Sequence, residues 1–187
     1  MKKGSHTTEP CKWWYAYFFD NPLRRFFHDP YALFSPYLRD GMTAVDVGCG
    51  MGYFSIAMAR MVGPNGLVYA ADIQQRMLDV MSKRAARAGV GGIVMPHLCG
   101  PASIGLGIRA DFVLTFWVLH EIQDPELTVK ELASILKPGG FYFLAEPKGH
   151  VDADTVRRLS AMPVEHGMVL TATPRVSMSH AFVYEKK

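Results

Sequence analysis

Short apolar segments alternate with segments of helical periodicity from about residue 42 to the C-terminus. The apolar segments are typical of buried strands, and segments such as 74–88, with Met77, Leu78 and Met81 on one face, are typical of amphipathic helices. A glycine- and proline-rich loop at 100–107 replaces or shortens the next helix. Strands are predicted at 43–47, 67–71, 93–98, 111–116, 141–145, 168–173 and 181–185, and helices at 52–62, 74–88, 124–137 and 152–162.

Alternation of apolar strands and helices predicts a parallel sheet that is covered on both faces. The last two strands are separated by too few residues for a crossover helix, so they must pair antiparallel. We therefore expect an α/β fold: a single Rossmann-like, doubly wound, seven-stranded sheet, mostly parallel with the last strand antiparallel, and helices on both faces. Ligands of such sheets bind beyond the carboxyl ends of the strands.

Composition limits the class of protein further. The 187 residues are 49% hydrophobic and 20% charged, which is typical of one globular domain. The longest apolar run, 112–119, is far too short to span a membrane, and no apolar segment follows Lys2 and Lys3 as in an export signal. We therefore expect a cytoplasmic protein with reduced cysteines and no transmembrane segment. A net charge of +3 does not favour a nucleic-acid partner.

The N-terminal part is rich in aromatic residues, since 13–37 holds 11 of the 22 in the chain. We expect two parts: an aromatic-rich, helical segment over 1–40 and an α/β domain over 41–187. The segment has three interpretations. It forms a lid that lines an apolar acceptor pocket, it packs against the sheet as an extra helix, or it contacts a membrane surface with the help of Arg24 and Arg25.

A glycine-rich loop follows the first predicted strand, where residues 46–52 read Asp-Val-Gly-Cys-Gly-Met-Gly. Glycine is needed where the backbone turns tightly against a ligand. Asp72 closes the second strand, where a carboxylate can accept both hydroxyls of a ribose. The third glycine comes one residue earlier than in loops that hold a pyrophosphate, and the Asp46 carboxylate would repel one. The loop therefore favours an adenosine that carries an amino acid, S-adenosylmethionine, over a nicotinamide cofactor.

Four segments together resemble the class I S-adenosylmethionine-dependent methyltransferases, of the small UbiE-like, type 11 kind. They are the glycine loop, Ala-Asp-Ile at 71–73, the segment 111–122 and Leu-Lys-Pro-Gly-Gly-Phe at 136–141. The resemblance implies S-adenosylmethionine as cofactor and S-adenosylhomocysteine as product. It assigns the cofactor site to Asp46 (amino group), Gly48, Cys49, Gly50 and Gly52 (methionine part), Asp72 (ribose), Ile73 (adenine), Phe116 and Trp117 (sulfonium), and Cys99, which stands where many relatives place an acidic residue near the adenine.

Methyl transfer needs positioning, exclusion of water and, for a protonated acceptor, a base. The candidate catalytic residues are His120, Glu146 and His150, which follow or close the fourth and fifth strands. Each has an alternative role in fixing a loop. Cys11, Cys49 and Cys99 would suit a soft acceptor if they converged, although cysteine is more often an apolar filler. No cysteine or histidine spacing indicates a metal site.

The partner expected from these features is a small, partly apolar acceptor, and a homodimer is compatible with the sequence. Two other functions stay open. The chain could bind S-adenosylmethionine without catalysis, as a partner or sensor, or it could be a nicotinamide-dependent oxidoreductase.

Overall fold

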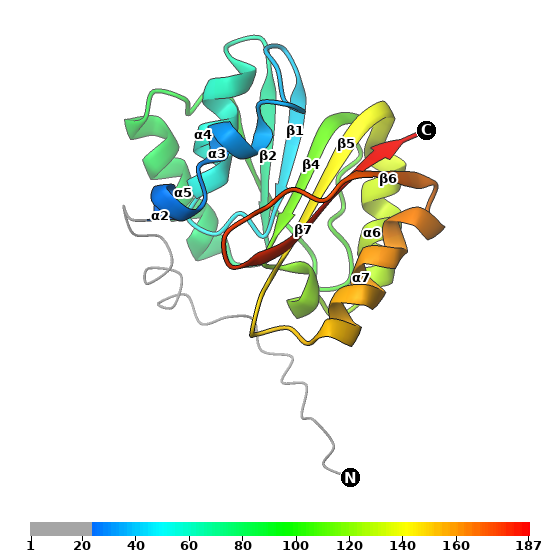
Figure 1. Cartoon of the computed structure of the whole chain (residues 1–187). Helices are drawn as coiled ribbons and strands as arrows, with labels where there is room; N and C mark the ends of the chain where they lie inside the picture. Colours follow the sequence, from blue (N-terminus) through cyan, green and yellow to red (C-terminus); the bar gives the residue numbers. More distant parts are fainter. Residues whose placement is uncertain (1–23) are drawn as a thin grey trace.

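The computed structural model describes residues 24–187 (Figure 1). Its centre is a seven-stranded sheet in the order β3-β2-β1-β4-β5-β7-β6. The strands are β1 (Thr43–Val47), β2 (Leu67–Asp72), β3 (Val94–Leu98), β4 (Ala110–Phe116), β5 (Leu136–Pro147), β6 (Met168–Ala172) and β7 (Ser179–Lys186). The helices are α2 (Arg24–Phe27), α3 (Pro30–Phe34), α4 (Tyr53–Val62), α5 (Gln75–Arg87), the 3-10 turn η1 (Leu119–Glu121), α6 (Pro125–Ile135) and α7 (Ala153–Glu165).

Strands β1 to β5 run parallel, while β7 pairs antiparallel with both β5 and β6. This confirms the predicted fold class and the predicted antiparallel pairing of the last two strands. The strand order reverses between β1 and β4, because β1 leads to β2 and β3 on one side and β4 leads to β5 on the other. The carboxyl ends of β1 and β4 are therefore the place where a ligand of this fold is expected.

Helices cover both faces of the sheet, with α3, α4 and α5 on one face and α6 and α7 on the other (Figure 1). Phe34 of α3 is completely buried and contacts the rings of Phe54, Phe112 and Phe143. On the opposite face Leu132 and Leu159 pack in a second apolar cluster. Burial of this apolar surface is the main source of stability for the scaffold that carries the site.

The boundary between α6 and β5 differs from the prediction. The helix expected to reach residue 137 ends at Ile135, and β5 begins at Leu136, opposite Ala110 and before a bulge. Pro138 explains the difference, because the residue before a proline is disfavoured in helical conformation. The loop at 100–107 holds no helix, as predicted, whereas the turn η1 was not predicted.

The N-terminal segment is described only from Arg24 onward. Its two short helices pack beside α4, and Asp29 caps α3 by accepting a hydrogen bond from the Tyr31 amide. The aromatic residues at 13–19 and Cys11 lie outside the described residues. Within 24–187, no helix combines the length and apolar character that crossing a membrane requires.

Candidate functional site

The glycine loop joins β1 to α4 and is held against the end of β2. The amides of Gly48 and Cys49 both donate to the Ala71 carbonyl, at 2.8 and 3.1 Å. All three glycines of the loop have positive φ, which explains why the chain uses glycine there: +70° at Gly48, +52° at Gly50 and +83° at Gly52.

The three glycines differ in what lies beside them. A Cβ added to Gly48 would come within 2.4 Å of Val118, and one added to Gly52 within 2.5 Å of Met81. A Cβ added to Gly50 would meet nothing within 4 Å. Gly48 and Gly52 thus allow close packing with the protein itself, and Gly50 is where the loop leaves room for a ligand.

Asp72 lies directly beside this opening. Its Oδ2 accepts a hydrogen bond from the Gly50 amide and its Oδ1 one from the Gln74 amide, both at 2.9 Å. Burial raises the pKa of this carboxyl, and the bonds from the amides of Gln74 and Gly50 oppose that rise. A carboxylate has about four acceptor positions, so it retains capacity for the hydroxyls of a ribose.

Two further predicted residues adjoin Asp72. Ile73 follows it at the end of β2 and has 48% of its side chain surface exposed, an apolar surface suited to stacking on a flat ring. The Cys99 amide donates to the Asp72 carbonyl at 2.9 Å. The ends of β2 and β3 therefore lie beside the opening at Gly50.

The three predicted catalytic residues meet at the ends of β4 and β5. His120, in η1, forms a hydrogen bond through Nδ1 to the Oε2 of Glu146, whose side chain is 1% exposed. The His150 ring lies edge-on to the His120 ring, with 5.5 Å between centroids. The sequence predicted these residues separately, and the structure makes His120 and Glu146 a pair.

Each side chain of the pair has one further buried polar atom. Among the described residues, His120 Nε2 and Glu146 Oε1 have no hydrogen-bond partner. Because a carboxylate only accepts, Nδ1 donates to it and the lone pair of the neutral ring lies on Nε2. This arrangement can take a proton from a bound molecule and can stabilise the resulting imidazolium.

Phe116 and Trp117 close β4 on the same edge of the sheet. Phe116 packs on the Phe54 ring with 4.6 Å between centroids. Trp117 has a φ of +62°, which is uncommon for a bulky residue and frequent at functional sites. Its amide donates to the Ala145 carbonyl, and its indole N–H donates to the Ser179 hydroxyl at 2.9 Å.

Comparison with known proteins decides the family. A sequence model of the family described as "Methyltransferase domain" matches residues 38–173, most of the chain. The chain belongs to this methyltransferase family. Demethylmenaquinone methyltransferase from Geobacillus kaustophilus is 31% identical over 103 residues, which are 55% of this chain and 44% of that protein. Ubiquinone biosynthesis O-methyltransferase from Caulobacter vibrioides is 31% identical over 140 residues, which are 75% of this chain and 52% of that protein.

The chain thus spans about half the length of the curated relatives it matches. Its fold is also that of a solved SAM-dependent methyltransferase from Aquifex aeolicus, with a TM-score of 0.80 at 21% identity, covering 94% of this chain and 97% of that one. Membership of this family implies S-adenosylmethionine as the cofactor and S-adenosylhomocysteine as the product. The open side of Gly50 and the buried Asp72 carboxylate beside it fit this cofactor.

Sequence reasoning missed one residue that lies beside Phe116 and Trp117, His28. It is buried, and its ring lies edge-on to Phe116 and Trp117, at 5.0 and 5.1 Å between centroids. Its Nε2 donates to the Ser177 carbonyl at 2.8 Å, and the Tyr53 hydroxyl donates to its carbonyl. Burial lowers the pKa of this imidazole. The aromatic composition of its segment was a signal, but no local pattern marks His28 itself.

Cys49 and Cys99, the cysteines within the described residues, behave as apolar fillers. Burial raises the pKa of Cys49 well above its usual value and that of Cys99 to about 11, so both remain protonated thiols at neutral pH. A protonated thiol is a poor nucleophile and metal ligand. No cluster of three histidine, cysteine or acidic residues within 24–187 could hold a metal ion.

Asp46, predicted near the amino group of the cofactor, is buried beneath the glycine loop. Its Oδ2 accepts a hydrogen bond from the Ser55 hydroxyl at 2.5 Å. Burial raises the pKa of this carboxyl from 3.8 to about 7, although the Ser55 bond opposes the rise. Its contact with the cofactor stays a prediction.

The raised pKa of Asp46 predicts a pH-dependent stability. The native state keeps the Asp46 proton up to about pH 7 and the unfolded state loses it near pH 4, so this group contributes stability that is lost as pH rises between these values. Asp46→Asn should abolish that loss. The difference in free energy of unfolding between Asp46→Asn and the unaltered chain should increase in favour of Asp46→Asn as pH rises. The increase should be up to ~1.4 kcal/mol per pH unit between about pH 5 and 6.5. Urea unfolding of both chains across this range measures the difference. A difference in stability that does not change with pH would refute the raised pKa of Asp46.

Proposed function

We propose that this methyltransferase transfers a methyl group to a hydroxyl of a small, partly apolar aromatic molecule, with His120 as the general base. The observation that carries the proposal is the His120–Glu146 pair at the ends of β4 and β5, in which Nε2 is buried and makes no hydrogen bond to any described residue. A protein that only binds the cofactor, as a partner or sensor, has no need of such a pair.

The groups around the opening of the glycine loop would hold the cofactor. The backbone at Gly50 would contact its methionine part, Asp72 would accept from its ribose hydroxyls, and Ile73 would cover its adenine. Phe116 and Trp117 would line the site near its sulfur. When bound, S-adenosylmethionine supplies a methyl group on a positively charged sulfur, which an acceptor atom takes by in-line displacement.

The chain contributes proton transfer and exclusion of water. His120 Nε2 takes the hydroxyl proton of the acceptor, so that the oxygen keeps the electron pair that forms its new bond to carbon. Glu146 keeps the imidazole oriented through Nδ1 and stabilises its positive charge. His28 contacts Phe116 and Trp117, which supports the lid among the three interpretations of the aromatic segment.

The class of acceptor is supported by the relatives. Their names, demethylmenaquinone methyltransferase and ubiquinone biosynthesis O-methyltransferase, refer to quinone compounds. We infer that the acceptor here is likewise a small ring compound with a hydroxyl group.

The test is transfer of an isotope-labelled methyl group from S-adenosylmethionine to catechols and hydroquinones. We expect labelled product and an equal amount of S-adenosylhomocysteine. Binding of S-adenosylhomocysteine without label in any of these acceptors, or in the small-molecule fraction of a cell extract, would favour the non-catalytic alternative instead.

A further inference from the structure

The imidazole of His28 connects the N-terminal segment to the end of β4. Its side chain is 3% exposed, and its ring stands edge-on to the rings of Phe116 and Trp117. The backbone of His28 is also fixed, because its amide donates to the Arg24 carbonyl and its carbonyl accepts from the Tyr53 hydroxyl, both at 2.8 Å. The position of the ring is therefore set by contacts on the side chain and on the backbone.

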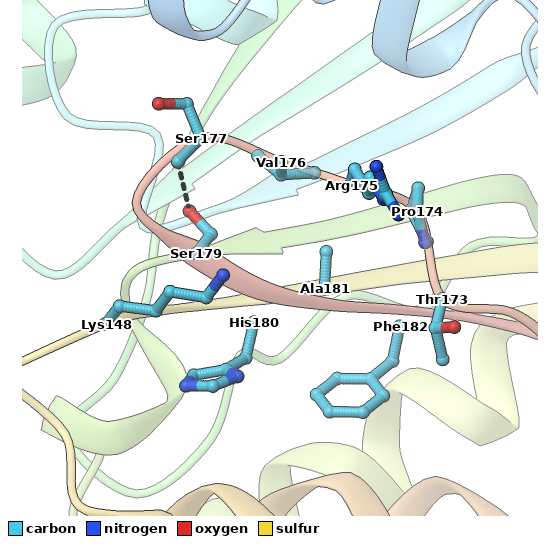
Figure 2. A pocket seen from close by; sticks show the side chains of 10 residues that line it. All are labelled: Lys148, Thr173, Pro174, Arg175, Val176, Ser177, Ser179, His180, Ala181 and Phe182. Carbon is cyan, nitrogen blue, oxygen red and sulfur yellow. Dashed lines mark hydrogen bonds between the residues drawn. The ribbon is translucent and has the colours of Figure 1, made fainter.

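A chain of hydrogen bonds fixes which nitrogen of His28 carries the proton. Nε2 lies 2.8 Å from the Ser177 carbonyl, and the same carbonyl accepts from the Ser179 hydroxyl at 3.1 Å (Figure 2). The Ser179 hydroxyl in turn accepts the indole N–H of Trp117. Because a carbonyl oxygen only accepts, Nε2 of His28 is the donor, and Nδ1 of the neutral ring carries the lone pair.

Nδ1 is the polar atom of the His28 ring that has no partner in the described part of the chain. It is buried, and no described residue forms a hydrogen bond to it. Burial lowers the pKa of this imidazole; the bond to Ser177 opposes the effect, and the charge of Arg24 adds to it. The ring is therefore neutral at pH 7 and Nδ1 can accept. A buried acceptor in this state costs free energy unless a bound molecule or a water meets it.

The His28 ring lies where a ligand of this fold is expected. Phe116 and Trp117 are at the carboxyl end of β4, one of the two strands between which the strand order reverses. Trp117 has a φ of +62°, and such backbone conformations cluster at functional sites. The aromatic contacts of the His28 ring suit a flat ring compound that carries a polar group.

We infer that His28 binds the methyl acceptor: its Nδ1 accepts a hydrogen bond from a hydroxyl of a ring compound that packs on Phe116 and Trp117. This inference rests on the proposed function and adds a residue that selects acceptors with a hydrogen-bond donor. The cofactor also carries a donor, its ammonium group, but Asp46 is the predicted partner of that group. His28 orients the acceptor, and proton transfer stays with His120.

Two substitutions separate binding through Nδ1 from the contact with Ser177. In His28→Gln the amide nitrogen reaches about as far as Nε2 and can still donate to Ser177, but no acceptor replaces Nδ1. In His28→Asn the amide oxygen replaces Nδ1 as acceptor, and the bond to Ser177 is lost. A role confined to holding the segment in place tolerates glutamine and not asparagine, whereas binding of the acceptor requires the reverse.

The probes are catechol and 1,2-difluorobenzene, rings of similar size of which only catechol donates hydrogen bonds. Each is titrated by calorimetry into the full chain saturated with S-adenosylhomocysteine. His28→Gln should weaken binding of catechol about three- to tenfold, the effect of one lost hydrogen bond between neutral groups, and leave binding of 1,2-difluorobenzene unchanged. His28→Asn should retain most of the affinity for catechol. His97→Gln is the matched control, because His97 Nε2 also bonds to a backbone carbonyl, that of Ile104, and it should change neither affinity.

Three results would overturn the inference. They are an equal loss of affinity for both probes in His28→Gln, unchanged binding of catechol in that variant, and no binding of catechol by the unaltered chain. Weaker binding of S-adenosylhomocysteine itself in His28→Gln would also overturn it, because the donor would then be the ammonium group of the cofactor.

Labelled methyl transfer separates these results from a failure of the proposed function. We expect His28→Gln to raise the KM for catechol about three- to tenfold with little change in kcat. Label in catechol whose binding does not depend on His28 leaves the reaction standing and removes His28 from the binding site. Binding of catechol that depends on Nδ1, with no label in it, supports His28 as a binding residue and removes the reaction.

Discussion

Gly50→Ala is expected to abolish most of the affinity for S-adenosylhomocysteine while the chain still folds. The new methyl group meets no protein atom within 4 Å, so the core is unaffected. It projects into the space that the loop leaves for the cofactor, and overfilling a fitted site costs about 1–3 kcal/mol, or ~5- to 150-fold in affinity. Calorimetric titration with S-adenosylhomocysteine measures the loss.

Gly41→Ala is the matched control. Gly41 also has a positive φ, +78°, and also has nothing within 4 Å of its added Cβ, but it lies in the turn before β1. Both substitutions carry the same left-handed strain of about 1–2 kcal/mol, which thermal unfolding will register in both. Only Gly50→Ala should lose binding. Equal affinities in the two variants would show that the cofactor does not approach the loop at Gly50.

Glu146→Gln and His120→Asn are expected to lower the rate of methyl transfer by about 10²- to 10⁴-fold, with affinity for S-adenosylhomocysteine unchanged. Positioned general bases contribute effects of this size. Glutamine at 146 can still accept the bond from His120 Nδ1, so it removes the negative charge and keeps the geometry. Single-turnover rates of the cofactor-saturated enzyme with a catechol acceptor give the comparison.

Glu121→Gln controls for a general effect of charge near the imidazole. Its carboxylate lies 3.8 Å from His120 Nε2, on the other side of the ring from Glu146, and is partly exposed. We expect a change of only a few fold in the transfer rate. An unchanged rate of methyl transfer in Glu146→Gln would remove the pair from the mechanism. So would a loss of rate in Glu121→Gln as large as that in Glu146→Gln.

The sheet could be predicted from sequence because each buried strand is a compact apolar run between turn residues. The error at the end of α6 came from Pro138, whose effect on Lys137 was outweighed by the helical pattern that precedes it. The aromatic pattern also did not indicate that Phe34 lies in the core of the sheet domain. Deleting the aromatic segment through residue 37 would remove a side chain at the centre of the core, so single substitutions such as His28→Ala test the lid better.

Much of the candidate site was predictable because its residues lie at the carboxyl ends of successive strands. The glycine loop and Asp72 flank the first helix, and parallel strands bring their ends to one edge. The partnership of His120 and Glu146 follows from the register, in which Phe116 lies opposite Ala145, the residue before Glu146. Contacts between distant segments had no such signal. His28 and Ser177, which share a hydrogen bond, are 149 residues apart in the chain.

The same calorimetric titration, run on the unaltered chain with S-adenosylhomocysteine and in parallel with NAD⁺, tests the central claim most directly. We predict saturable binding of S-adenosylhomocysteine at one site, loss of that binding in Asp72→Ala, and no heat with NAD⁺. Absence of binding by S-adenosylhomocysteine, or preferential binding of NAD⁺, would contradict the assignment of the glycine loop and the function built on it.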